Sequence, residues 1–397
     1  MVVRFARRIG SLYREAFSGL PRLTWLLCLA AFINRCGSMV VPFLGLYAKE
    51  KFAFDPSEAG ALLSTYGAGA FVGSWLGGWL ADRIGPVRAQ VWTLSASGLW
   101  MLLMIGVREV PWLFTGVFVL GVLNDAFRPG SITAVAMSVT PDLRRKALTL
   151  NRLALNLGWS FGPTIGGFLV LADFQWMFVA DGGTCLAAAA FLAITFRNWR
   201  PIAPAREPMS WTLPFRDRHF LWLMTANLIV LLAFMQYFTT GARVFGDSGY
   251  SKVQIGFFLA VNPVLITLFE MPLVHALRGH RAIPITAMGS AVVGLGYLCM
   301  LLPWDAASVV LAMAVVAGGE LLQMPMLGAH INEHAPSHAR GAYNGAYGMT
   351  FCLALLLAPL LGGWIYEQNG APVLWWTCGG LGLLASALFW LGGQPRR

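Results

Sequence analysis

Four ionisable side chains lie near the centres of long apolar stretches of this 397-residue chain: Arg35, Asp125, Arg128 and Glu320. Because a charge in apolar surroundings is costly unless it is paired, such groups are candidates for function. Asp125 and Arg128 stand at positions i and i+3 and share one face of a helix. The two carboxylates are therefore candidates for binding a proton. The structural alternative is a salt bridge between Asp125 and Arg128.

Further polar residues extend this set. Glu270, just before Pro272, is a third candidate for a proton, and its alternative role is to close a helix end. Arg152 and Asn156 are one helical turn apart and line a cavity, unless Arg152 reaches back to the membrane surface. For Trp159, contact with an apolar substrate competes with ordinary packing. The candidate cavity residues are Asn34, Arg35, Asn124, Arg128, Arg152, Asn156 and Trp159.

The segment HINEH, residues 330–334, matches a metalloprotease pattern. A zinc enzyme needs this pattern inside a formed helix, with a third ligand nearby. Because Pro336 follows, we expect a short polar loop here and neither a metal site nor catalysis. The six cysteines lie in apolar stretches without a C-x-x-C pair, so we expect buried thiols.

The elements that position these groups are membrane helices. The chain is 57% hydrophobic and 12% charged, with a mean hydropathy of +0.64, whereas a soluble domain carries about 25% charged residues. The net charge of +10 therefore does not indicate nucleic-acid binding; in a membrane protein, the positions of the basic residues indicate the orientation instead. The sequence predicts an all-α polytopic membrane protein with twelve spans: 23–48, 57–81, 87–107, 111–137, 147–172, 174–196, 219–241, 251–275, 282–302, 306–331, 341–366 and 371–392.

Lysines and arginines predict the orientation. With the N-terminus inside, 20 of the 28 basic residues fall on the cytoplasmic side and 5 on the outer side, so both termini are expected in the cytoplasm. We expect a cytoplasmic segment 1–22, a six-helix bundle 23–196, a polar and basic linker 197–218, a second six-helix bundle 219–392 and a cytoplasmic tail 393–397.

The two predicted bundles repeat each other at a spacing of 196 residues. A parallel duplication is typical of secondary transporters, which bind substrate near the bilayer midplane. The matched pairs are Gly60 with Gly256, Pro129 with Pro325, Pro163 with Pro359, and Gly166–Gly167 with Gly362–Gly363.

Two glycine-rich stretches stand out. GWLADRIGPVR, residues 78–88, forms a tight turn between the second and third spans, and we expect Gly77 and Gly78 to allow close helix contact. Asp82 is expected to pair with a neighbouring arginine or a helix N-terminus. In GWSFGPTIGG, residues 158–167, the glycines create a groove and Pro163 permits a bend.

The first stretch resembles the signature loop of the major facilitator superfamily, and the second resembles a motif of its proton-driven exporters. The resemblance covers nearly the whole chain and implies two pseudo-symmetric six-helix bundles. The chain departs from the pattern at Pro86 and Val87, and the matching loop 275–281 of the second half is degenerate. The resemblance marks Gly78, Asp82, Arg83, Gly85 and Arg88 as a gating loop, and Gly158, Gly162, Pro163, Gly166 and Gly167 as the motif of span 5.

We therefore expect a secondary transporter that works by alternating access. It exports small lipophilic or cationic compounds in exchange for protons, as a monomer in the inner (cytoplasmic) membrane, with no metal or cofactor. One alternative is a proton-coupled uptake symporter for a small anionic or polar solute, which Arg35 and Arg128 would hold. The alternative of another class is a membrane-embedded enzyme, for which the sequence offers no convergent nucleophile and base.

Overall fold

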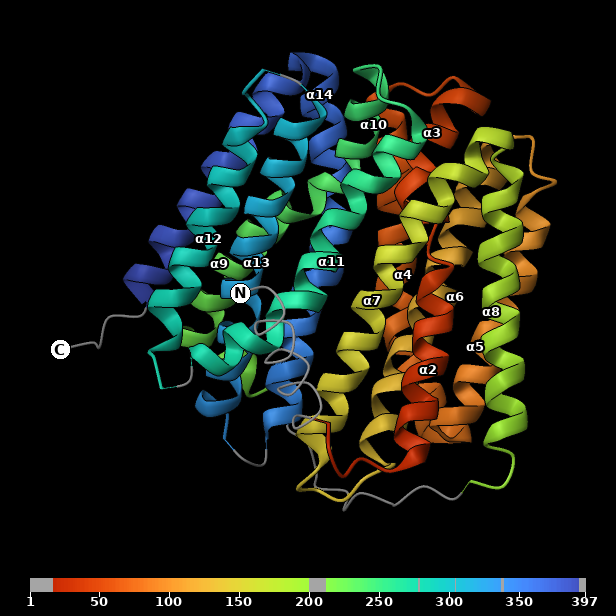
Figure 1. The fold of residues 1–397 in the computed structure, drawn as a ribbon, viewed down its shortest axis with the longest axis vertical. Helices are drawn as coiled ribbons and strands as arrows, with labels where there is room; N and C mark the ends of the chain where they lie inside the picture. Colours follow the sequence, from red (N-terminus) through yellow and green to blue (C-terminus); the bar gives the residue numbers. More distant parts are fainter. Residues whose placement is uncertain (1–16, 200–211, 278, 304, 337–338, 393–397) are drawn as a thin grey trace, which may run out of the picture. The chain divides into compact units, whose positions relative to one another are not determined.

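The structure, a computed structural model, describes residues 17–199, 212–277, 279–303, 305–336 and 339–392. Every regular element within these ranges is a helix, which confirms the all-α class (Figure 1). The elements are α2 (Arg22–Cys36), α3 (Val40–Phe52), α4 (Pro56–Ile84), α5 (Pro86–Met104), α6 (Val110–Ala136), α7 (Arg144–Ala172), α8 (Gln175–Thr195), η1 (Pro214–Arg216), α9 (Arg218–Phe234), η2 (Met235–Tyr237), α10 (Thr240–Asp247), α11 (Lys252–Ala276), α12 (Ala282–Cys299), α13 (Ala306–His334) and α14 (Arg340–Gly392).

Nine stretches of the described residues are helical, long and apolar enough to cross a membrane, as expected of a multi-pass membrane protein. α4 and α5 are long enough but are not among the nine, because glycine, serine and tryptophan dilute their apolar residues. α14 counts once, although Gly370, with φ 78° and ψ 177°, interrupts its helical backbone. The number of twelve spans therefore stays a prediction.

The described residues form two compact units. Unit 1 comprises residues 17–43 and 68–199, and unit 2 comprises residues 44–67 and 212–392. Residues 44–67 precede the predicted linker in the sequence, yet they pack with the second unit. They include most of α3 and the first turns of α4. Sequence order alone therefore does not define the packed units.

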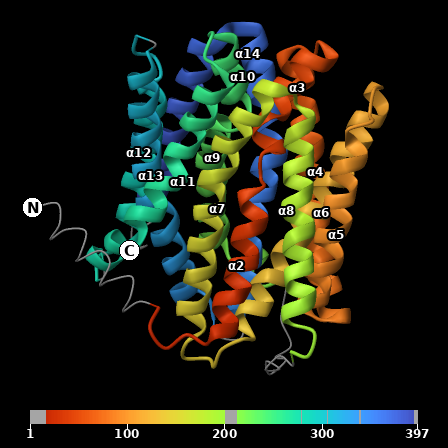
Figure 2. The ribbon, with the colours of Figure 1, turned by 45° about the vertical axis from the view of Figure 1, so that its right-hand side comes forward.

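In unit 1, α2 packs against α7 and α8, and α5 packs against α6 and α8 (Figure 2). Glycines let α4 approach α6 closely. A Cβ at Gly69, Gly73 or Gly77 would lie 2.1 Å from a backbone carbonyl oxygen of α6, so only hydrogen fits there. Gly78 faces open space, so our expectation of a close contact holds for Gly77 and was wrong for Gly78.

In unit 2, α12 packs against α13 and α14, α14 packs against α9, and α11 packs against α13. The ends of these helices have local stop and start signals. α11 and α13 each begin with a capping box, formed by Ser251 with Gln254 and by Asp305 with Ser308.

Two predicted spans are interrupted. The span 23–48 is not one helix, because α2 ends at Cys36 and α3 begins at Val40. The span 219–241 contains the 3-10 turn η2 between α9 and α10. Since apolar residues continue through both breaks, hydropathy did not reveal them.

The loop expected at residues 330–334 was also wrong. α13 continues to His334, and Ala335 has the extended conformation that commonly precedes a proline. Pro336 thus ends the helix only after both histidines of the HINEH segment have been placed on it.

Candidate functional site

The charged cluster of unit 1 consists of Arg35, Asp125, Arg128 and Asp181. Arg35 lies in the last turn of α2, with its guanidinium carbon 6.0 Å from the ring centroid of Trp159 on α7. Asp125 on α6 is half-buried, and the positive charges of Arg128 and Arg35 both attract it. Among the contacts of the described residues, no direct ion pair joins Asp125 to Arg128. Its charge is therefore balanced at longer range by two arginines.

Asp181 on α8 closes the break between α2 and α3. Its Oδ2 accepts hydrogen bonds from the backbone N–H groups of Met39 at 3.3 Å and Val40 at 3.4 Å. The residue is only 4% exposed, and the charge of Arg35 acts on it as well. Because the first N–H groups of a helix lack partners within it, a carboxylate placed there stabilises the interrupted span.

Amide side chains surround this cluster. Asn34 donates a hydrogen bond to the Cys185 thiol at 3.4 Å, and the hydroxyl of Ser97 donates to Oδ1 of Asn124. Arg152 and Asn156 lie half-buried on α7. The structure thus brings Asn34, Arg35, Asp125 and Trp159 of the predicted set into one region of unit 1, together with Asp181.

The glycines of the span-5 motif form the face of α7 on which the interrupted span lies. A Cβ at Gly158, Gly162 or Gly166 would lie 2.5 Å, 2.8 Å and 3.0 Å from atoms of residues 35–39. Pro163 and Gly167 are buried in the same helix. The expected groove is therefore present, and it holds the end of α2 and the break that follows.

Unit 2 holds a carboxylate in a network of neutral side chains. Glu320 on α13 is 8% exposed, and its Oε2 accepts a hydrogen bond from the amide of Asn262 on α11 at 2.8 Å. Oδ1 of Asn262 accepts from the hydroxyl of Tyr237 at 3.3 Å. Since Tyr237 lies in η2, this network connects a buried carboxylate to the break in a helix.

A second chain of hydrogen bonds lies one turn away on α13. Gln323 donates to Asn227 on α9 at 2.9 Å, and Asn227 donates to Thr350 on α14 at 2.7 Å. All three residues are buried. Sequence reasoning missed them, because single uncharged polar residues in apolar stretches follow no spacing rule.

Glu270, the third carboxylate of the predicted set, is 8% exposed on α11. The helix continues past it to Ala276 in spite of Pro272. The alternative role at a helix end was therefore wrong, and Glu270 is a buried carboxylate about two turns from Asn262 on the same helix.

A cluster of ion pairs on the side predicted to face outward, here called the outer cluster, ties residues 44–67 to the rest of unit 2. Asp247 forms ion pairs with Lys49 and with Arg243, the latter at 3.0 Å, and accepts a hydrogen bond from Tyr366 at 2.9 Å. Arg243 also donates to the carbonyl oxygen of Phe54 at 3.1 Å. A further ion pair joins Lys252 to Glu50 at 2.8 Å. From the sequence, only the i, i+4 spacing of Arg243 and Asp247 pointed to any of these contacts.

The predicted gating loop turns as expected. Gly85 adopts φ 90°, a conformation that favours glycine, and Pro86 occupies the first turn of α5. The guanidinium of Arg83 lies over the Trp79 ring at 4.6 Å. Asp82 is exposed, and among the described contacts it pairs with neither neighbouring arginine, so the expected pairing within the loop is not formed.

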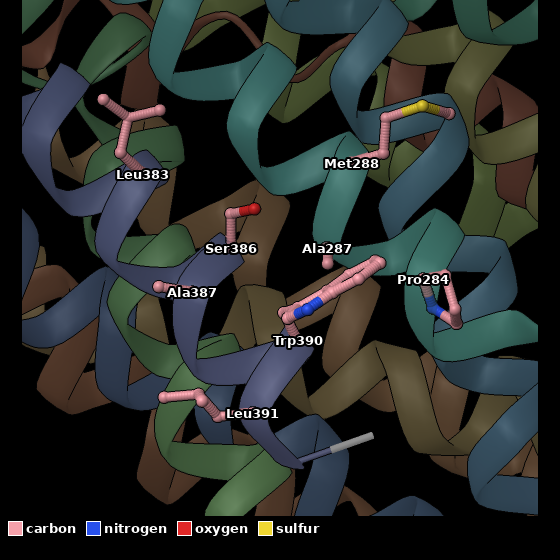
Figure 3. Close-up of a pocket in the computed structure, with 8 residues that line it drawn as sticks. All are labelled: Pro284, Ala287, Met288, Leu383, Ser386, Ala387, Trp390 and Leu391. Carbon is pink, nitrogen blue, oxygen red and sulfur yellow. The ribbon is translucent and has the colours of Figure 1, made fainter. Parts of the chain in front are cut away.

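An open groove between α12 and the last part of α14 is lined almost entirely by apolar side chains (Figure 3). Trp390 and Met288 in it are 58% and 51% exposed. Because it contains no ionisable group, it offers no means of coupling transport to protons. Its lining residues are Pro284, Ala287, Met288, Leu383, Ser386, Ala387, Trp390 and Leu391.

Helical units with interrupted helices and buried polar side chains are typical of secondary transporters. The family model of the Major Facilitator Superfamily matches residues 27–359 and 322–397, and the chain belongs to this family of membrane transporters. It is thus a transporter and not an enzyme.

Three similar proteins illustrate this membership. The uncharacterised MFS-type transporter YqjV of Bacillus subtilis is 23% identical over 79% of each chain. The multidrug resistance protein MdtG of Klebsiella pneumoniae is 28% identical over 52% of this chain and 49% of its own. A POT family transporter solved in complex with 5-aminolevulinic acid has a TM-score of 0.80 at 15% identity, over 94% of this chain and 96% of its own, which is a likeness of fold alone.

Proposed function

We propose that this transporter exports small lipophilic or cationic compounds in exchange for protons, as a monomer in the inner (cytoplasmic) membrane with both termini in the cytoplasm. The observation that carries the proposal is Glu320, a buried carboxylate with a neutral amide donor. Burial makes the charged form of a carboxylate less favourable, and a neutral amide donor such as Asn262 offsets this less than an arginine would. The likeness to MdtG supports a multidrug substrate range.

Coupling follows if Glu320 binds a proton or a cationic substrate, but not both together. A proton arriving from the outer side neutralises the carboxylate and releases the cation, and loss of the proton to the cytoplasm restores the site for the next cation. Because Asn262 links Glu320 to Tyr237 in η2, the protonation state is coupled to the interrupted helix. Alternating access then converts proton entry into substrate exit.

The outer cluster and the loop 78–88 are proposed to act as contacts that form in one state and break in the other. The ion pairs of Asp247 with Lys49 and Arg243 attach residues 44–67 to unit 2. In the state open to the opposite side these contacts must be exchanged for water. The Lys49–Asp247 pair is partly exposed, and exposed pairs contribute only about 0–1 kcal/mol each, so it is the pair most easily exchanged, whereas separating Asp247 from the buried Arg243 costs more.

The second candidate function is proton-coupled uptake of a small anionic solute. Arg35 and Arg128 favour it, since two guanidinium groups near the half-buried Asp125 offer paired donors to a carboxylate or phosphate. The difference between the two functions lies in the sign of the substrate charge.

The test is transport by the purified protein in proteoliposomes with an imposed pH gradient. The substrates are a panel of lipophilic cations and organic anions, each with the gradient in both directions. We expect cation movement against proton flow, lost in Glu320→Gln. Movement of anions together with protons, unaffected by Glu320→Gln, would replace the exporter by the symporter.

A further inference from the structure

Three imidazole side chains converge at one end of unit 2. His219 lies in the first turn of α9, and His330 and His334 lie one turn apart at the end of α13. Their ring centroids are 5.2 Å to 5.9 Å apart, and one ring nitrogen of each residue lies within 4.8 Å of the others. His219 is thus the third ligand that a metal site on the HINEH segment needs. The sequence did not reveal it, because His219 is more than a hundred residues away along the chain.

The surroundings favour a bound cation over a solvated surface cluster. His219 and His330 are half-buried. Nε2 of His330 is buried and has no hydrogen-bond partner in the described part of the chain. A buried nitrogen without a partner is costly, and a metal ion satisfies it by taking its lone pair.

An aspartate orients one of the imidazoles. Oδ2 of Asp217 lies 2.6 Å from Nε2 of His334 and accepts a hydrogen bond from Tyr343 at 2.9 Å. A carboxylate at this distance favours the tautomer of His334 that carries its proton on Nε2, which leaves Nδ1 to bind a metal.

We propose that His219, His330 and His334 form a binding site for a divalent transition-metal ion of the Zn²⁺ class, with Asp217 as the outer-shell partner of His334. Three imidazoles are a common ligand set for such ions, with the metal about 2.0–2.1 Å from each nitrogen. The three nitrogens lie within 4.8 Å of one another, so binding requires the rings to turn toward a common point, and water takes the fourth position. The bound ion ties the first turn of α9 to the last turn of α13. This site is independent of Glu320 and of the proposed export.

The experiment measures metal binding by the full-length protein in detergent, purified without a polyhistidine tag and freed of metal with a chelator. Zn²⁺ is titrated in competition with a chromophoric chelator, and bound Co²⁺ is followed by its visible absorption. We expect one ion per chain, a rise in melting temperature with Zn²⁺, and a Co²⁺ spectrum of low coordination number. His330→Gln should weaken Zn²⁺ binding at least tenfold, and Asp217→Asn about tenfold.

The matched controls are His275→Gln and His280→Gln, which change exposed histidines outside the cluster and should bind Zn²⁺ like the wild type. Size-exclusion profiles and helical circular dichroism show whether each variant is folded, and His334→Asn provides a second ligand variant if His330→Gln is not. Equal Zn²⁺ affinity in wild type and the folded ligand variants would overturn the proposal. So would an equal loss of affinity in the control variants.

Discussion

Units 1 and 2 break a membrane helix at equivalent points of the sequence repeat and close the break by different chemistry. A shift of 196 residues carries residues 37–39 onto 233–235, where α9 gives way to η2. In unit 1 the carboxylate of Asp181 accepts the free N–H groups. In unit 2 the neutral amide of Gln236 donates to the carbonyl oxygen of Ala358 at 2.7 Å. The helix break is thus present in both units, but the side chain that hydrogen-bonds there is charged in unit 1 and neutral in unit 2.

The same contrast extends to the polar groups around each break. Unit 1 gathers two arginines and two carboxylates, whose charges balance one another. Unit 2 places Glu320 beside Asn262 and Tyr237, which are neutral. The comparison teaches that the two units hold their buried polar groups by different means: by opposite charges in unit 1, and by hydrogen bonds between a carboxylate and neutral groups in unit 2.

Glu320→Gln gives the largest expected effect. It should abolish gradient-driven transport while sparing energy-independent exchange of substrate, because the neutral amide mimics the protonated state permanently. Both activities are measured in proteoliposomes, with Glu333→Gln as control, an exposed carboxylate on the same helix. Full gradient-driven transport in Glu320→Gln would move the coupling role to Glu270 or Asp125.

Gly162→Val should also be severe, because a Cβ at this position would already lie 2.8 Å from the carbonyl oxygen of Ser38. We expect loss of transport together with a lower melting temperature, as α7 is pushed away from the broken span. Gly183→Val is the control, since a Cβ there meets nothing within 4 Å. If Gly162→Val transports as well as this control, the motif of span 5 is ordinary packing.

Asp125→Asn tests whether the charges of unit 1 balance each other. Loss of the carboxylate leaves Arg35 and Arg128 without their shared counter-charge, so the melting temperature should fall. The double variant with Arg128→Gln should recover a large part of that loss, which a double-mutant cycle measures. An unchanged melting temperature combined with lost proton coupling would instead make Asp125 a proton site.

Asp181→Ala should cost about 1–3 kcal/mol of stability, because the backbone N–H groups of Met39 and Val40, at the start of α3, lose a buried acceptor. Thr377→Ala, at the position equivalent by the repeat, should cost little, since the Thr377 hydroxyl donates only within its own helix turn. The measurement is thermal unfolding of both variants in detergent. Equal losses in the two variants would contradict the assignment of Asp181 as the cap of the broken span.

Asp82→Asn gives the smallest expected effect on the fold. Asp82 is exposed, so the free energy of unfolding should stay within about 0.5 kcal/mol of the wild-type value. Transport should still fall severalfold if the loop forms a contact in another state of the cycle. Wild-type transport rates in this variant would remove the gating role from the loop.

Much of this protein could be predicted from its sequence. Mean hydropathy and the placement of basic residues predict a multi-pass helical membrane protein, and the repeat predicts its duplicated helices. The glycines at 158, 162 and 166 predicted a groove, because four-residue spacing places small residues on one face of a helix. Charges in apolar stretches made Glu320 and Asp125 candidates for function, because a charge there is costly unless it is paired.

Only the tertiary structure shows which residues the buried polar side chains contact and where the helices end. The breaks after Cys36 and Phe234 depend on hydrogen bonds with distant residues, such as the one that the Met39 N–H donates to Asp181, and not on local hydropathy. Likewise, His219 joins His330 and His334 only because α9 and α13 are neighbours in unit 2. Local sequence determines helix periodicity and burial, whereas the pairing of polar groups far apart in the chain is determined by how the helices pack.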